Sequence, residues 1–243
     1  MIRWAFRHTL YAMALGFGGL IAWSATRPAL EGSGTPATEE RDVVGEPTEV
    51  VISGMGAVLL VQGPAPAVRV TADDNIVPHL KANTSGKRLT LTTDTSAALK
   101  PKTNIRYRVT LPNLTAVTVS GAASVGTDTF NCEKLAVKLS GAGKADLHDL
   151  TCRSLALTLS GAGKANVTGT AEHATIKLSG AGTIDATALR VGTAEVQLSG
   201  AGKATVWADV LKARVSGAGV VKYKGAPQLE QKVRGAGTIR PLE

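Results

Sequence analysis

From Thr115 onward, the hydrophobic and polar positions of the chain repeat with a period of about 20 residues. The repeat is marked by a tetrapeptide of small residues, SGAG or a close variant of it. Its copies start at Ser120, Ser140, Ser160, Ser179, Ser199, Ser216 and Arg234, so successive starts differ by 20 at most (120 to 140) and by 17 at least (199 to 216). One coil of a β-solenoid has this length, whereas a helical repeat is about twice as long. The period therefore predicts an all-β fold, a parallel β-helix (β-solenoid) of about seven coils.

When the copies are aligned on the tetrapeptide, aliphatic residues fall into columns. The column directly before the Ser contains Val119, Leu139, Leu159, Leu178, Leu198, Val215 and Val233. A second column lies two residues earlier, and a third lies five residues after the Ser. Because the side chains of a strand alternate between its two faces, this spacing predicts a strand on each side of the tetrapeptide, with apolar residues inward. Parallel coils connected in this way are expected to form a right-handed helix.

The tetrapeptide itself is predicted to form the corner between the two strands. The residue after the Ser is glycine in every copy, at Gly121, Gly141, Gly161, Gly180, Gly200, Gly217 and Gly235. Glycine is required where the backbone takes dihedral angles closed to other residues, or where neighbouring coils come close together. The alanine that follows in every copy is expected to pack at the tight corner without leaving a void.

The residues before the repeat also carry strand patterns. β-branched residues and period-two alternation predict strands at 48–63, 67–72, 87–93 and 104–112. Residues 73–80 are expected to form one short turn of helix. Because a solenoid needs covers over its ends, the strands of residues 43–118 are predicted to cap the coils of residues 119–243.

Residues 1–24 are typical of an export signal. Basic residues precede an apolar run from Thr9 to Trp23, and small residues stand at the positions that a signal peptidase reads before a cleavage after Ser24. The run is shorter than the roughly 20 residues of a membrane span, so cleavage is the first interpretation and an uncleaved N-terminal anchor the second. Residues 25–42 are rich in Pro, Gly, Ser, Thr and Glu and are predicted to be a disordered linker. Residues 43–243 then form the folded domain.

Composition and charge refine this picture. Of the 243 residues, 44% are hydrophobic but only 4% are aromatic, which predicts a narrow, layered core of aliphatic side chains. The net charge of +8 becomes +6 if residues 1–24 are removed. A basic exported protein is suited to anionic envelope polymers or membrane surfaces, although solubility alone also explains the charge. Nucleic acid is not expected as a partner of an exported chain in which no aromatic residues interleave with the basic ones.

The two cysteines follow the register of the repeat. Cys132 and Cys152 each lie eight residues before the Ser of their copy, so they are expected to stack on adjacent coils. Their Cα separation is then near the spacing between strands, which a disulfide accepts, and disulfides persist in exported proteins. We therefore predict a disulfide, with two free thiols as the alternative. A metal site is not predicted, because only two cysteines and no histidine share this register.

The order of these motifs resembles a known family. Its marks are "VVISGMGAVLLVQG", "VRVTADDNIVPHLKANTSGKRLTLTT" and "RVTLPNLTAVTVSGAASV", followed by coils that carry "LSGAGKADL". Together they resemble the auto-transporter adhesin head domain family, also called the head GIN domain, over roughly residues 43–243. The resemblance implies an exported domain of the parallel β-helix type with an adhesive role. The family carries no pattern of catalytic residues.

The glycine-rich corner does not have the spacing of a nucleotide-binding loop. A P-loop requires a Gly five residues before Gly143, where this chain has Lys138, and Ser or Thr after Lys144, where it has Ala145. The dinucleotide fingerprint fails as well, because Asp146 occupies the position of its third Gly. The sequence therefore predicts a structural corner and no bound cofactor.

Calcium binding and catalysis are not predicted either. The column that contains Asp146 and Asp185 has only these two carboxylates among its seven members, which is too few for a calcium ladder. Some β-helices cleave polysaccharides with two or three carboxylates on one outer face. The histidines share no phase with a nucleophile or a carboxylate pair; they are His8, His79, His148 and His173.

Two outward columns that flank the corner are rich in basic residues. One lies two residues before the Ser and the other four residues after it. Their basic members are Lys138, Lys144, Lys164, Lys177, Lys203, Arg214 and Lys232. We interpret them as a candidate basic binding ridge for an anionic envelope polysaccharide. The alternative is a solvated strand face on which lysines keep the protein soluble and discourage edge aggregation.

These features predict a non-catalytic, exported protein of the periplasm or cell surface that uses a β-solenoid for adhesion or ligand contact. The alternative is a structural or regulatory envelope module whose partners are envelope proteins only. A third alternative is a polysaccharide-cleaving enzyme. Contact with a membrane is expected only through the N-terminal segment, if that segment is not cleaved.

Overall fold

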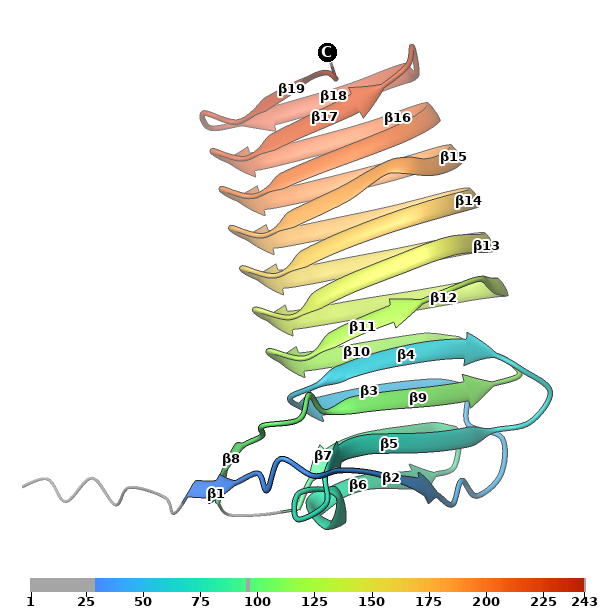
Figure 1. Ribbon diagram of the computed structural model, residues 1–243. Coiled ribbons are helices and arrows are strands. Elements are labelled where there is room, and N and C mark those ends of the chain that lie inside the picture. Colours follow the sequence, from blue (N-terminus) through green and yellow to red (C-terminus); the bar gives the residue numbers. More distant parts are fainter. Residues whose placement is uncertain (1–28, 95–96, 243) are drawn as a thin grey trace, which may run out of the picture.

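The computed structural model describes residues 29–94 and 97–242, and most of them lie in β-strands (Figure 1). The single helical element in these ranges is the short 3-10 turn η1 (Val77–His79), where the sequence predicts one turn of helix. In the same ranges, no helix is long and apolar enough to cross a membrane. The predicted export signal, residues 1–24, lies outside the described residues.

The second half of the chain forms a stack of parallel coils, and the fold class predicted from the sequence is confirmed. The solenoid has about six turns. Its strands are β10 (Ala116–Gly121), β11 (Ser124–Thr127), β12 (Phe130–Gly141), β13 (Lys144–Gly161), β14 (Lys164–Gly180), β15 (Thr183–Gly200), β16 (Lys203–Gly217), β17 (Val220–Lys224), β18 (Gln228–Arg234) and β19 (Thr238–Pro241). The first residues of the tetrapeptides are in register from coil to coil, as Ser140 is with Ser160 and Ser216 is with Arg234. The corners consequently line up along one edge of the stack, at the left in Figure 1.

The predicted apolar columns point into the coil. Leu139, Leu159 and Leu198 are at most 2% exposed, and the same holds for their neighbours in the column as far as Val215. The last member, Val233, is 41% exposed because β18 has a neighbouring coil on one side only. The interior is therefore closed along the stack and opens at the last coil.

The corner has the glycine conformation that the sequence predicts, but its alanine plays another part. Gly141 and Gly161 have φ values of 100° and 118°, and a Cβ on Gly161 would lie 2.5 Å from the carbonyl oxygen of Gly141. The expectation that the alanine packs at the corner is wrong, because Ala142 and its counterparts are exposed. The second glycine of the tetrapeptide, such as Gly143, is the buried residue of the corner and lies on its inward side. It lies so close to the coil below that a Cβ would be 2.9 Å from the carbonyl oxygen of Ala123.

The solenoid begins earlier than the sequence analysis placed it. Strands β3 (Glu49–Gly54) and β4 (Ala57–Gln62) are parallel to β10 and β11, and Ser53–Gly54 is in register with Ser120–Gly121. The SGMG at Ser53 is thus one more corner of the same stack. The division of the domain at residue 118 is corrected accordingly: only part of residues 43–118 forms a cap.

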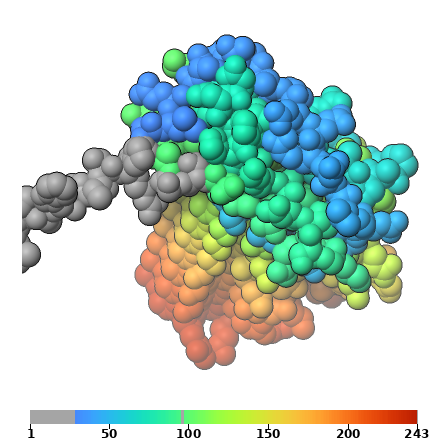
Figure 2. Space-filling model, turned by 90° about the horizontal axis from the view of Figure 1, so that it is seen from below, coloured from blue at the N-terminus to red at the C-terminus, as the bar shows by residue number. Residues whose placement is uncertain are grey.

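The first turn is covered by four strands, two of which run parallel to it and pair antiparallel with the other two. These are β5 (Ala67–Asp73), β6 (Leu80–Ser85), β7 (Arg88–Thr93) and β9 (Arg106–Leu111). β9 pairs with β4 and β5, and β7 pairs with β3 and β6, so the cap continues the sheets of the coils. Seen from below in Figure 2, this part covers the end of the stack. The sequence predicts β5, β7 and β9 correctly but does not reveal β6.

The prediction of a disordered linker is wrong for residues 29–42. β1 (Ala29–Glu31) pairs with β8 (Ala98–Lys100), and β2 (Pro36–Arg41) pairs antiparallel with β5. Between them, the segment is held by Asp73, which is fully buried. Its carboxylate accepts hydrogen bonds from the main-chain N–H groups of Gly34, Lys102 and Thr103, at 2.9–3.1 Å. These bonds tie residues that are remote in sequence to β5.

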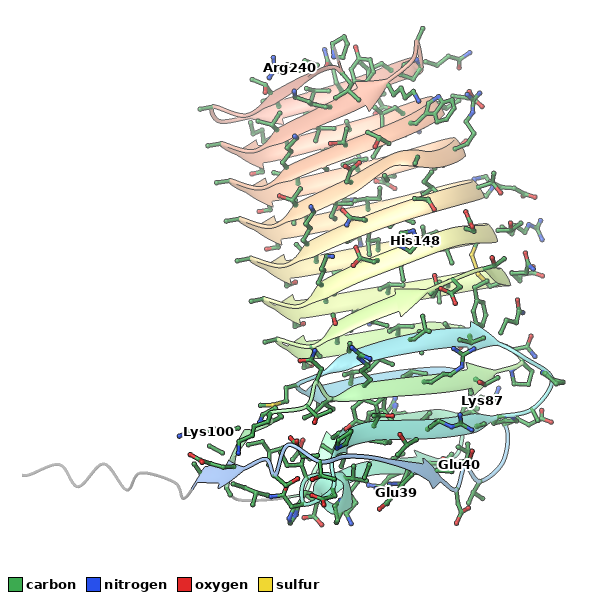
Figure 3. All side chains as sticks on the ribbon, viewed as in Figure 1. Glu39, Glu40, Lys87, Lys100, His148 and Arg240 are labelled. Atoms are coloured by element: carbon green, nitrogen blue, oxygen red, sulfur yellow. A yellow bond between two sulfur atoms is a disulfide. The ribbon has the colours of Figure 1, made fainter. Side chains whose placement is uncertain are left out.

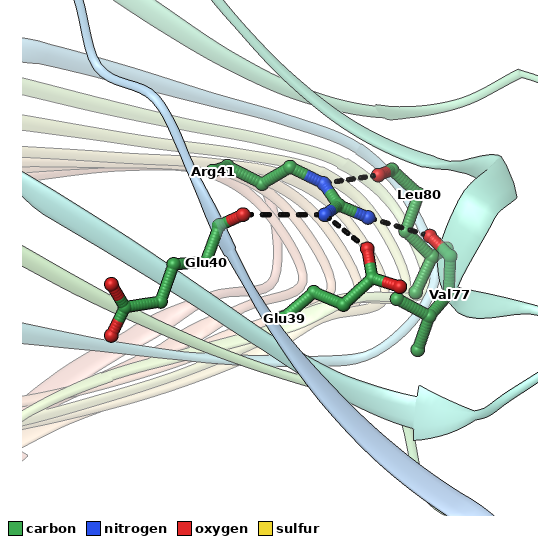
Figure 4. A network of polar contacts seen from close by, with 5 residues as sticks. All are labelled: Glu39, Glu40, Arg41, Val77 and Leu80. Carbon is green, nitrogen blue, oxygen red and sulfur yellow. Dashed lines mark hydrogen bonds and ion pairs between the residues drawn. The ribbon is translucent and has the colours of Figure 1, made fainter.

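Arg41 fixes the end of β2 against the 3-10 turn (Figure 4). Its guanidinium donates to the carbonyl oxygens of Val77 at 2.8 Å and Leu80 at 3.2 Å, and it pairs with Glu39 at 2.6 Å. The Val77 carbonyl already accepts the main-chain N–H of Leu80 within the turn, so the arginine adds a second hydrogen bond at the end of the turn. The side chain is only 18% exposed, which places this contact inside the cap.

Candidate functional site

The seven basic residues predicted from the sequence flank the corner in two columns. All seven are exposed. The strands before the corner carry one column in register, in which Thr158 and Gln197 alternate with the cations Lys138, Lys177, Arg214 and Lys232. Lys144, Lys164 and Lys203 lie in register on the strands after it. Because the corner reverses the chain, the two columns lie on two different faces of the stack, which meet along its edge.

The column before the corner lines a hollow. An open groove of about 470 Å³ runs along the coils from Thr158 to Lys232. One wall is the column Thr158, Lys177, Gln197, Arg214 and Lys232. The other wall is the corner column Ser179, Ser199, Ser216 and Arg234. Between the walls lie Leu159, Leu178, Leu198 and Val215, whose side chains point into the core, so their main chain forms the floor. We call this feature the corner groove.

The charges of the corner groove are all positive. Lys177, Arg214, Lys232 and Arg234 line it, and no Asp or Glu is among its lining residues. Arg214 is partly neutralised from outside the groove, by Glu195 at 2.8 Å and Glu230 at 3.7 Å. Within the described residues, Lys177, Lys232 and Arg234 form no ion pair. Three of the four cations are thus available to a ligand.

Glu195 stands beside the corner groove and is held in its charged form. Its side chain accepts a hydrogen bond from Gln197 at 3.0 Å and another from Arg214 at 2.8 Å. These bonds, together with the positive charges of Arg214 and Lys177, lower the pKa of the Glu195 carboxyl below its usual value of 4.5, against the opposing effect of burial. At neutral pH, the carboxylate therefore reduces the positive potential near the middle of the groove.

In the column after the corner, Lys144 has a partner of its own, whereas Lys164 and Lys203 form no ion pair within the described residues. Lys144 forms an ion pair with Asp146 at 2.6 Å, and Asp146 accepts a hydrogen bond from Asn166 of the next coil, also at 2.6 Å. Burial tends to raise the pKa of Asp146, but these two contacts, with the charges of Lys144 and His148, lower it. Across the described ranges, no three His, Cys, Asp or Glu side chains are grouped as a metal site requires.

The two cysteines meet on the edge of the stack opposite the corners (Figure 3). Cys132 and Cys152 are in register on β12 and β13, and their sulfur atoms are bonded, with a Cα–Cα distance of 4.8 Å. The bond joins two adjacent coils near the start of the regular repeat. It lies away from the corner groove.

One cluster was not singled out in the sequence. Trp207 lies between Arg190 and Lys224, which are its register neighbours on the coils below and above. The two cationic groups are 4.8 Å and 4.1 Å from the centre of its ring. Both faces of the indole are thereby covered, so this contact ties three coils together and leaves no free aromatic face for a ligand.

The comparisons with known proteins agree with this architecture. The family model described as "Putative auto-transporter adhesin, head GIN domain" matches residues 46–227. The chain belongs to this family. The match includes the SGMG corner and the cap as well as most of the coils. No curated protein matches the chain significantly.

Solved structures with the same fold come from Bacteroides and Parabacteroides species. A "putative adhesin" from Bacteroides fragilis NCTC 9343 is 26% identical, with a TM-score of 0.83, and the match covers 88% of this chain and 100% of that one. A "putative adhesin" from Parabacteroides merdae is 22% identical, with a TM-score of 0.69 and coverage of 89% and 100%. A "putative lipid binding protein" from Parabacteroides distasonis is 21% identical, with a TM-score of 0.74 and coverage of 88% and 100%. The last two similarities concern the fold alone.

Proposed function

We propose that this head GIN domain is an exported, non-catalytic envelope protein that contacts an anionic polymer of the cell envelope through the basic surface beside its corners. The adhesive and non-catalytic parts of the proposal are supported by the family description. The anionic ligand is supported by the exposed cations on both sides of the corner, which occur on several coils of the stack. The observation that carries the proposal is the corner groove, which is lined by four cations and no acidic residue.

Repeated cations suit a polymer better than a small molecule. A rigid stack presents its charges at fixed intervals, because adjacent parallel strands are about 4.8 Å apart. A polymer can engage several of these charges at once, so that each additional contact is made at a high effective concentration. Exposed charges act through water, and the attraction is therefore expected to weaken as salt is added.

The proposal is tested by retention on polysaccharide beads. The purified chain is applied to immobilised polygalacturonate and to immobilised neutral dextran, at about 0.01 M and about 1 M salt, where the Debye length is roughly 30 Å and 3 Å. We expect retention on polygalacturonate at low salt only, and none on dextran. Absence of retention on any anionic polymer, with capture of envelope proteins in its place, would support a structural module with protein partners only.

Export is tested separately by fractionation of the native cells. We expect the chain in the envelope or periplasmic fraction, with Cys132 and Cys152 protected from alkylation until a reductant is added. A cytoplasmic protein whose thiols react with alkylating reagents at once would refute this part of the proposal.

A further inference from the structure

We infer that the corner groove is the binding site for a linear acidic polysaccharide that lies along the axis of the stack, with the coils as successive subsites. This inference rests on the proposed function and narrows it. It assigns the ligand to the column before the corner and gives the lysines after the corner no part in binding. It also specifies the orientation of the ligand.

The direction of the ligand follows from how the groove is built. Its two walls are formed by outward residues in register, so each step along the stack adds further polar or cationic side chains. From Thr158 to Lys232, the groove covers four steps between coils, or about 19 Å at about 4.8 Å a step. A ligand that crosses the groove meets one or two coils, whereas a ligand that follows it meets them all.

The groups in the groove suit a hydroxyl-rich, negatively charged chain. Lys177, Lys232 and Arg234 offer unpaired positive charges to carboxylates. Thr158, Gln197 and the serine wall offer hydroxyl and amide groups, which both donate and accept hydrogen bonds as sugar hydroxyls require. No aromatic residue lines the groove, which disfavours the stacking of nucleic acid bases.

The position of Glu195 provides a separate test of whether the ligand lies along the corner groove. Its carboxylate neutralises Arg214 and lies beside Gln197, near the middle of the length of the groove. A polyanion that lies along the groove must pass this negative charge. Its removal is therefore expected to tighten binding, whereas it would not affect a ligand held at the lysines after the corner.

The experiment compares two triple variants that remove the same amount of charge. The groove variant is K177S/K232S/R234S, and the matched control is K144S/K164S/K203S. All six side chains are exposed on strands or at the corner, and melting curves check that both variants stay folded. Binding of fluorescent oligogalacturonates of increasing length to the purified full chain is measured by anisotropy at low salt.

We expect the groove variant to bind at least tenfold more weakly than the wild type, and the control to stay within about twofold. The E195Q variant is expected to bind about two- to fivefold more tightly. Affinity for the wild type should rise with oligomer length until the oligomer spans about 19 Å, and then level off.

The outcomes separate this inference from the proposed function. Equal weakening in both triple variants would overturn the groove as the site and leave attraction by the whole basic surface in place. Stronger weakening in the control would also overturn it and assign the ligand to the other column. Binding only to anionic phospholipid vesicles would overturn the assignment of a polysaccharide as the ligand. If the wild type binds no acidic probe, the proposed function fails together with the inference.

Discussion

A single buried carboxylate, that of Asp73, helps to hold the N-terminal segment in place beside the strand pairings of β1 and β2. Burial tends to raise the pKa of Asp73, but the N–H groups of Thr103, Lys102 and Gly34 stabilise its charged form and lower its pKa below the usual 3.8. A group whose pKa is lower in the folded state stabilises the fold above its ordinary pKa and loses this effect as the pH falls. The contribution of Asp73 is therefore complete at neutral pH and is lost as the pH falls below about 3.8.

Replacement of this carboxylate tests its role. We expect D73N to melt at a lower temperature than the wild type at pH 7, because an amide NH₂ would face main-chain N–H groups that need an acceptor. The difference should narrow as the pH falls below about 3.8, where the wild type loses the charge as well. D74N is the control, because Asp74 is exposed and accepts a hydrogen bond from Ser33 at the surface. A difference that is constant with pH would contradict this account.

The order that Asp73 helps to impose on residues 29–42 could not be predicted from the local sequence. The polar composition of residues 25–42 predicts disorder, since it holds too few apolar residues to drive burial. The partners that order this stretch, Asp73 and β5, lie much further along the chain. The inward glycine of the corner was missed for a related reason: Gly143 looks like Gly141 in the sequence, and only the stacking shows which of them points into the core.

At the scale of the coil, we predict that the corner tolerates a larger side chain at Ala162 but not at the neighbouring Gly161. G161A should destabilise the protein by about 2 kcal/mol or more, because a Cβ would approach Gly141 within 2.5 Å at a φ of 118°. A162S, the control, adds a hydroxyl to an exposed side chain and should change stability by less than about 0.5 kcal/mol. Denaturant unfolding measures both variants. Equal stability of the two would show that the coils can move apart at the corner.

The disulfide gives a second prediction for the coils. Cys132 and Cys152 close a loop with a sequence separation of 20, for which the loss of unfolded-state entropy corresponds to roughly 3 kcal/mol. Reduction should therefore lower the denaturation midpoint of the wild type. The double variant C132A/C152A should already unfold at a lower midpoint and should not respond to the reductant. A wild type insensitive to reduction would mean that the stacked coils alone hold these strands.

The register of the coils could be predicted from the sequence because each corner follows the previous one after a nearly constant length of chain. The corner at Ser53 has a similar tetrapeptide, SGMG, but its stacking partner Ser120 comes much later in the chain. The cap is inserted between them, and a search for a constant period does not bridge it. The clue was present in the strand pattern on both sides of SGMG, which matches that of the coils.

At the scale of the whole molecule, the sequence identified basic residues beside the corner but not the surface that they share. Columns that flank a corner are close together in an alignment of the repeats. For this reason, the seven basic residues were assigned to one ridge. The corner places them on two faces of the stack. Four cations line the corner groove, and one of them, Arg234, was not among the seven. Arg234 takes the position of the Ser in the last tetrapeptide. The sequence does not show that this Ser column is a wall of the groove, so it does not show that Arg234 lines the groove either.

The two ends of the described stack differ, and this predicts a gradient of local stability. The strands of the cap cover the first turn, and its Val50 and Ile52 are at most 2% exposed. At the other end, Val233 is 41% exposed, and β18 and β19 each pair with one strand only. Coils of a solenoid are stabilised by their neighbours, so a coil with one neighbour opens more readily than a coil with two.

Hydrogen exchange followed by mass spectrometry measures this gradient. Amides of β18 and β19 should exchange fastest, those of β16 and β17 more slowly, and those of β13 to β15 slowest, with the covered strands β3 and β4 similar to the middle of the stack. An acidic oligosaccharide in the corner groove should slow exchange in β18, because Lys232 and Arg234 lie on that strand. Uniform protection along the stack would show that the coils open together, and an unchanged β18 in the bound state would place the ligand elsewhere.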